Sequence, residues 1–321
     1  MPKLKRALLA VSLLAAQGLL SHASPANSRL LTLIPAGVNL VAGVEDPHNQ
    51  NTNGHHLLVT VANSVELDDW LALTGVDNHR SVEQIIWLAS SSTRGPLKEH
   101  ALLVSGRFDR DHIFRAAKQN GSSSTWYGGV ESLVIQPLPR DSGRIGETRW
   151  LTILDGQAAV FGTPWFVQKI IDRYAAHTPA DPELVRYVGQ LRGNTNSWTI
   201  LALDGDPTAR AFATQHLPSP WTELLQPATV LISGIRYGGT THIDFSIQLP
   251  PDRISPHTQP ADALPTLLTD GWLESAHARI ESFSVASGQI TGTLALPQTQ
   301  FDAYFHSRAW DASRPLTASA K

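Results

Sequence analysis

The chain has no cysteine and only one methionine among its 321 residues. The absence of cysteine excludes disulfides, thiolate–zinc sites, iron–sulfur clusters, thiol catalysis and lipid attachment at a cysteine. A single methionine excludes a methionine-rich copper site. Packing of an apolar core must therefore stabilise the fold, and a chain of this length is long enough to bury such a core without covalent cross-links.

Positive charge is also scarce. Lys and Arg number 25 against 28 Asp and Glu, which gives a formal net charge of −3. Beyond the first few residues, the basic side chains form no cluster. This distribution argues against a nucleic-acid partner and against binding to an anionic membrane surface. No long apolar run follows residue 20, so the remaining sequence predicts no membrane-spanning helix.

The N-terminus has the pattern of a secretory signal peptide. Lys3, Lys5 and Arg6 precede an apolar stretch at 7–20, and Ser21-His22-Ala23 supplies small residues for cleavage. The apolar stretch is short for a bilayer span, so a retained anchor helix is the less favoured alternative. We expect residues 1–23 to be removed and the protein to be exported, as a periplasmic or secreted protein with no stable membrane span after cleavage.

Two segments of the remaining sequence open alike. Residues 38–47 and 198–207 each contain a short apolar run, then acidic and glycine residues, then proline. This pattern is typical of a buried strand that ends in a turn. We predict an α+β fold of two tandem copies of a β-α-β-β-α-β-like unit, with antiparallel or mixed sheets and helices on one face.

The expected organisation follows from this repeat. It comprises a signal peptide (1–23), a first α+β repeat (30–176), a bridging helix or linker (177–196), a second α+β repeat (197–310) and a disordered tail (311–321). Asp109 and Thr163-Pro164 predict helix starts. Residues 242–249 predict a strand, because Ile243, Phe245, Ile247 and Leu249 alternate onto one face.

Two segments of the first half carry a resemblance. They are 33–44, with the sequence LIPAGVNLVAGV, and 101–109, with the sequence ALLVSGRFD. The segment 126–130 and the strand and helix at 158–174 fit the same pattern. Over residues 30–175 the chain resembles a loose group of exported bacterial proteins of unknown function. The resemblance implies export and the repeat, and it implies no activity or functional residue.

Catalytic and metal motifs are not evident in the sequence. His48, His55 and His56 share one polar loop with two acidic residues, which is a chemically suitable set for zinc or copper. Their spacing matches no known metal motif, and a glycine- and asparagine-rich loop does not hold ligands rigidly, so we favour an ordinary polar loop. The sequence has no esterase nucleophile elbow, phosphate-binding loop or dinucleotide fingerprint. We therefore expect no catalytic residue, no metal and no cofactor.

Tryptophan is unusually frequent, with 9 residues. Trp126 and Trp165 lie near a turn and a helix start, where an indole can stack on a sugar or anchor a protein partner. The alternative is that they only cover the edge of the core. The sequence favours a non-enzymatic binding or scaffolding protein of the cell envelope, with an envelope protein or a glycan as partner. The alternative is a hydrolase of an envelope or extracellular polymer, with a site assembled from scattered His, Asp and Ser.

Overall fold

A computed structural model of the chain describes residues 28–45, 82–92, 95–136, 148–214, 225–250, 277–286 and 288–303. The helices are α2 (Ser28–Thr32), α6 (Arg110–Gln119), α7 (Pro164–Ala175), α8 (Pro182–Val188) and α9 (Pro207–Thr214). The strands of the first half are β1 (Leu40–Glu45), β2 (Val82–Ser92), β3 (Gly95–Gly106), β4 (Ser123–Tyr127), β5 (Val130–Ile135), β6 (Arg149–Ile153) and β7 (Ala158–Gly162). The strands of the second half are β8 (Ser197–Ala202), β9 (Val230–Arg236), β10 (Thr240–Gln248), β11 (Arg279–Ala286) and β12 (Gln289–Pro297).

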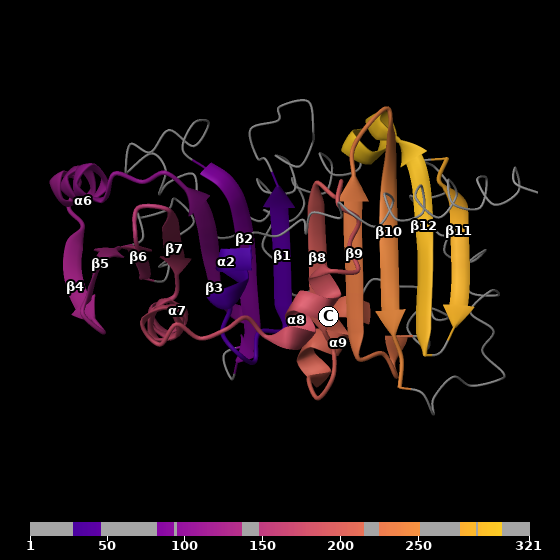
Figure 1. The fold of residues 1–321 in the computed structure, drawn as a ribbon, viewed down its shortest axis with the longest axis horizontal. Coiled ribbons are helices and arrows are strands. Elements are labelled where there is room, and N and C mark those ends of the chain that lie inside the picture. The colour runs from indigo at the N-terminus through magenta and orange to yellow at the C-terminus, as the bar shows by residue number, and fades with distance from the viewer. Residues whose placement is uncertain are drawn as a thin grey trace, which may run out of the picture.

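Within the part of the chain that the structure describes, all strands join one 12-stranded sheet in the order β11-β12-β10-β9-β8-β1-β2-β3-β7-β6-β5-β4. Every pairing is antiparallel. Figure 1 shows the strands side by side in one row, with β4 at one edge and β11 at the other. The two halves of the chain meet where β1 pairs with β8, with Leu40 opposite Leu201.

The predicted fold, an α+β arrangement of separate units with helices on one face, is wrong. The fold is dominated by a single antiparallel sheet, and helices pack on both of its faces. On one face, here named the α7 face, Phe166 and Ile170 of α7 share a buried cluster with Val160 of β7. On the opposite face, the α6 face, Phe114 of α6 is buried with Phe161 of β7.

The sequence of β7 explains why both faces are covered. Successive side chains of a strand point to opposite faces, and all five residues of β7 are buried. A strand that is apolar on both sides needs packing on both sides. The same holds for the pair that joins the halves: Val41 and Ile200 belong to the core of the α7 face, while Leu40 and Leu201 belong to a cluster of the α6 face. Two separate units would leave β1 and β8 as long apolar edge strands, which proteins avoid.

Several local predictions are confirmed. Asp109 caps α6, because its side chain accepts a hydrogen bond from the backbone N–H of His112 at 3.0 Å. The Thr163-Pro164 pair begins α7. The predicted strand at 242–249 matches β10. Strand β4 was not predicted, because its serines suggest a loop. It is an edge strand, and each of its residues is exposed or half-buried.

The structure describes one element of the expected domain organisation, the helix between the two halves. The expected helix between the halves is present as α8, where Asp181 accepts a hydrogen bond from the N–H of Glu183 at 2.8 Å. The internal repeat and the boundaries at 30–176, 177–196 and 197–310 stay predictions. The signal peptide (1–23) and the tail (311–321) lie outside the described residues.

Candidate functional site

The α7 face changes from apolar to polar between β9 and β11. In β10, Ile243, Phe245 and Ile247 pack into clusters on the α6 face, as their alternation predicts. The intervening residues face the other way, beside β9 residues of the α7-face core: Ser246 pairs with Ile232 in the β9–β10 ladder. The polar residues of this surface on β10 and β12 are His242, Asp244, Ser246, Gln248, Gln289, Thr291 and Thr293.

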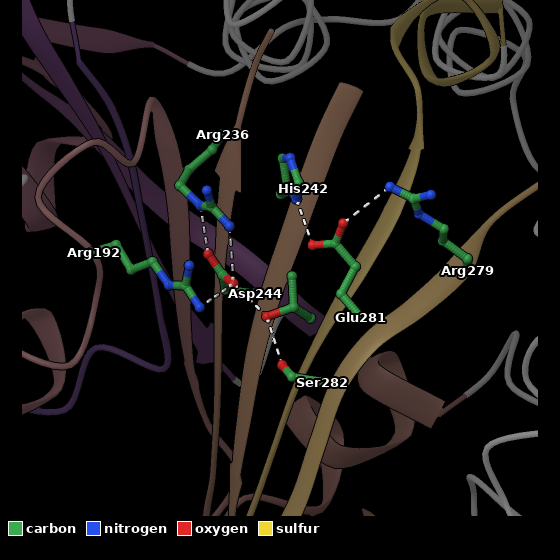
Figure 2. A network of polar contacts seen from close by, with 8 residues as sticks. Arg192, Arg236, His242, Asp244, Arg279, Glu281 and Ser282 are labelled. Atoms are coloured by element: carbon green, nitrogen blue, oxygen red, sulfur yellow. Dashed lines mark hydrogen bonds and ion pairs between the residues drawn. The ribbon is translucent and has the colours of Figure 1, made fainter. Parts of the chain in front are cut away.

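Asp244 is the centre of a polar network on this surface. Its carboxylate accepts hydrogen bonds from Arg236 Nε at 2.8 Å and Nη2 at 3.4 Å, and from Thr293 Oγ1 at 2.7 Å. A second guanidinium approaches from outside the sheet, with Arg192 Nη2 3.5 Å from Asp244 Oδ1. Ser282 extends the network to β11 by donating a hydrogen bond to Thr293 at 3.1 Å, as Figure 2 shows. The carboxylate is thus fixed from three sides, by donors on β9, on β12 and on the segment after α8.

A glycine explains how Arg192 reaches the sheet. Gly234 of β9 lies opposite Asp244 in the ladder. A Cβ atom at Gly234 would lie 3.1 Å from Thr195 Cγ2 and 3.2 Å from Leu191 Cδ2, so the segment after α8 lies directly on the glycine backbone. This close approach places Arg192 within ion-pair distance of Asp244. Thr195 is only 3% exposed, and its Oγ1 has no hydrogen-bond partner among the described residues.

These elements enclose a pocket of about 320 Å³, here named the α8–β10 pocket. Hydroxyl, amide and charged side chains line it, namely Thr195, Ser246, Ser282, Thr291, Thr293, Gln190, Gln289, Arg192 and Asp244. The amides are already ordered: Gln289 Nε2 donates to Ser246 Oγ at 2.8 Å and to Gln190 Oε1 at 3.3 Å. The volume is in the range of small-ligand sites, and the lining offers both donors and acceptors.

A second polar group lies one row farther along β10. His242 Nδ1 is 2.9 Å from Glu281 Oε2, and Arg279 Nη2 is 3.3 Å from the other oxygen of Glu281 (Figure 2). The register of β11 shifts between Ile280 and Ser282, and such a bulge redirects a side chain toward its neighbour. A carboxylate that orients an imidazole is two thirds of a hydrolytic triad. Within the described residues, no serine or threonine hydroxyl hydrogen-bonds to the His242 ring.

The two tryptophans selected from the sequence are exposed, Trp126 by 67% and Trp165 by 46%. They do not share a surface. Tyr127 donates a hydrogen bond to Asp172 of α7 at 3.2 Å, so its neighbour Trp126 points to the α6 face, whereas Trp165 belongs to α7. Their exposure leaves both indoles accessible, and their role in partner binding stays a prediction.

Beside Trp126, Glu131 lies opposite in the β4–β5 ladder and contacts α6. The hydrogen bond from Lys118, at 3.0 Å, is the main reason that the pKa of the Glu131 carboxyl is lowered, and Arg110 adds a second at 2.7 Å. Trp126 thus borders a charged patch in which Arg110 and Lys118 both contact Glu131.

The metal candidates His48, His55 and His56 lie outside the described residues. Within those residues, no group of three His, Asp or Glu side chains is arranged to hold a metal ion. The helices described there include none that is long and apolar enough to cross a membrane.

Sequence reasoning missed Arg192, Arg236, Asp244, His242 and Glu281. One signal was present for two of them, His242 and Asp244: the alternation that predicts the apolar face of residues 242–249 also places the polar residues of that strand on the opposite face. A solvated strand face is polar in any antiparallel sheet, so alternation alone does not single out a site. The contribution of Arg192 depends on Gly234 and carries no signal in the local sequence.

Comparisons with models of known protein families, with characterised proteins and with solved structures find no match to this chain. The resemblance of residues 30–175 to exported bacterial proteins of unknown function therefore stays a prediction, and function must be argued from the α8–β10 pocket itself.

Proposed function

We propose that the chain is an exported, non-enzymatic binding protein of the cell envelope, and that the α8–β10 pocket binds a hydroxyl-rich ligand, a segment of a glycan. The observation that carries the proposal is the lining of the pocket, which brings five hydroxyl and two amide side chains together around one space.

The chemistry of the lining supports a glycan. Each sugar hydroxyl donates one hydrogen bond and accepts others, so it needs a surface that offers both functions. The pocket supplies hydroxyls from five residues, amides from Gln190 and Gln289, and the Arg192–Asp244 pair. Because neighbouring side chains already position Gln289 and Thr293, little side-chain entropy is lost when a ligand binds.

The same network argues against catalysis by Asp244. Two guanidiniums and one hydroxyl contact its carboxylate, so its oxygens are occupied and positioned as acceptors. A general base needs a free lone pair that faces the reacting proton. Asp244 is better suited to fix Arg192 and Arg236 than to move a proton.

A hydrolase is the second candidate, and the His242–Glu281 contact of 2.9 Å favours it. It would require a nucleophile or an activated water at the second ring nitrogen of His242. The two candidates predict different results. A binding protein leaves the glycan intact, whereas a hydrolase shortens it, and the His242→Gln variant of a hydrolase would no longer do so.

The experiment uses the mature protein and two soluble tetrasaccharides, chitotetraose and a hyaluronan tetrasaccharide, with calorimetry for affinity and chromatography for turnover. We expect binding without turnover, and Thr291→Val, which keeps the shape and removes a hydroxyl of the pocket lining, to weaken binding about tenfold. Thr125→Val on β4 is the matched control and should bind as the wild type does. If neither sugar binds, or if Thr291→Val binds as tightly as the wild type, the proposal is wrong.

A further inference from the structure

The two arginines that contact Asp244 differ in their exposure and in the number of contacts that they make to its carboxylate. Arg236 is 14% exposed and directs two N–H groups at the carboxylate, at 2.8 and 3.4 Å. Arg192 is 54% exposed and makes one contact to it, at 3.5 Å. Arg236 therefore offsets the charge of Asp244 closely, and the charge of Arg192 is largely in excess at the mouth of the pocket.

Only two charged residues line the described part of the pocket, Arg192 and Asp244. With Arg236 bound to the same carboxylate, the local group carries two positive charges and one negative charge. In the adjacent row, Arg279 and Glu281 contact each other, so they add no net charge. The excess is local, because the whole chain has a formal charge of −3.

A guanidinium has five N–H donors in a rigid plane, and it pairs with a carboxylate through two parallel hydrogen bonds. With a single 3.5 Å contact to Asp244, Arg192 keeps donors for a ligand. Lysine would supply the charge without this paired geometry.

We infer that the ligand of the α8–β10 pocket is an acidic glycan, and that Arg192 binds its carboxylate while the hydroxyls of β10 and β12 bind the sugar ring. This inference rests on the proposed function and adds the charge of the ligand to it. Arg236 acts as a positioning residue, since it fixes Asp244, which in turn orients Arg192.

The test compares a hyaluronan tetrasaccharide with its carboxyl-reduced form, which has the same ring structure without the acid. The wild type is expected to bind the acidic form about tenfold more tightly, as one charge-assisted bidentate pair allows. Arg192→Gln should remove that preference, whereas Arg192→Lys should retain part of it. The control is Arg186→Gln on α8, which replaces an arginine of similar exposure that pairs with Glu183. Unchanged melting temperatures will show that each variant is folded.

The outcomes separate the two proposals. If both forms bind equally and Thr291→Val weakens both, the preference for an acid is wrong and the glycan site remains. If Arg192→Gln keeps the preference, Arg192 is not the acid-binding residue and the inference is wrong. If neither form binds the wild type, the glycan site itself is wrong, and the inference is wrong with it. Higher ionic strength should weaken binding of the acidic form and leave the reduced form unchanged.

Discussion

Replacing Gly43 with alanine should destabilise the fold more than any ordinary exposed substitution. Gly43 lies in β1, opposite Trp198 of β8, in the strand pair that joins the two halves of the sheet. A Cβ atom at position 43 would overlap the indole ring of Trp198. Trp198 is 1% exposed and belongs to the core of the α7 face, so the ring has no free space to move into.

The size of the effect follows from this packing. Overfilling a packed core costs about 1–3 kcal/mol, because side chains and backbone must shift. Both strands here are paired on each side, β1 with β2 and β8 with β9, so the backbone cannot separate without losing further hydrogen bonds. We therefore expect Gly43→Ala to reduce the free energy of unfolding by about 3 kcal/mol, at the upper end of that range.

A double-mutant cycle isolates the cause. Trp198→Val removes the overlapping ring atoms and keeps a residue that favours strands, at a cost of about 3 kcal/mol for the lost packing. In that background Gly43→Ala should cost almost nothing, so the coupling between the two positions is about 3 kcal/mol. Gly239→Ala is the control, because a Cβ atom there has nothing within 4 Å.

Urea denaturation followed by circular dichroism measures all four proteins, with the midpoint compared at constant slope. The reasoning is refuted if Gly43→Ala costs less than about 1 kcal/mol, or if its cost is the same with tryptophan or valine at position 198. Either result would mean that Trp198 does not lie across Gly43 in the sheet.

Three further predictions concern stability, the exposed tryptophans and export. Burial raises the pKa of Tyr237 to about 12, so the stability that its neutral form provides is present below pH ~10 and lost as pH rises from ~10 to ~12. The free energy of unfolding measured in urea should fall by roughly 2 kcal/mol over this interval in the wild type and by less in Tyr237→Phe. Trp126→Ala and Trp165→Ala should leave the melting temperature nearly unchanged, because both side chains are exposed. A pull-down from envelope extract will show whether either variant loses a partner that the wild type captures. When the protein is expressed with its own N-terminus in a Gram-negative host, it should be found in the periplasmic fraction with Ser24 as its first residue. Retention of the uncleaved chain in the inner membrane would contradict the signal-peptide interpretation.

The sequence predicted local structure better than the arrangement of the sheet. Turn and cap residues act within a few positions, so Asp109 and Thr163-Pro164 marked helix starts correctly, and Gly128 and Gly129 adopt positive φ in the β4–β5 turn as a hairpin requires. Gly238 and Gly239, which also follow a tyrosine, do not adopt positive φ, so the same Tyr-Gly-Gly sequence forms a different turn there.

Strand pairing is a non-local property, and here the prediction failed. The openers at 38–47 and 198–207 were expected to begin two separate units, yet β1 and β8 are hydrogen-bonded to each other. Their local sequences specify apolar strands and carry no information on which strand lies beside them. Helix placement failed for the same reason: an apolar helix stripe shows that a face is buried, and it does not show on which side of a sheet the helix packs.

The positions that bring distant segments together are glycines. A side chain at Gly43 would overlap Trp198, and a side chain at Gly234 would press on Leu191 and Thr195. In each case the missing side chain is what lets another part of the chain lie on the strand backbone, and at Gly234 that part carries Arg192 to Asp244. A glycine within a strand marks a bulge, a bend or such a close approach, so it leaves the identity of the approaching group open. The pocket was therefore hidden in the sequence although its strand residues alternate regularly, because part of its wall comes from the segment after α8, which can lie on β9 only where Gly234 has no side chain.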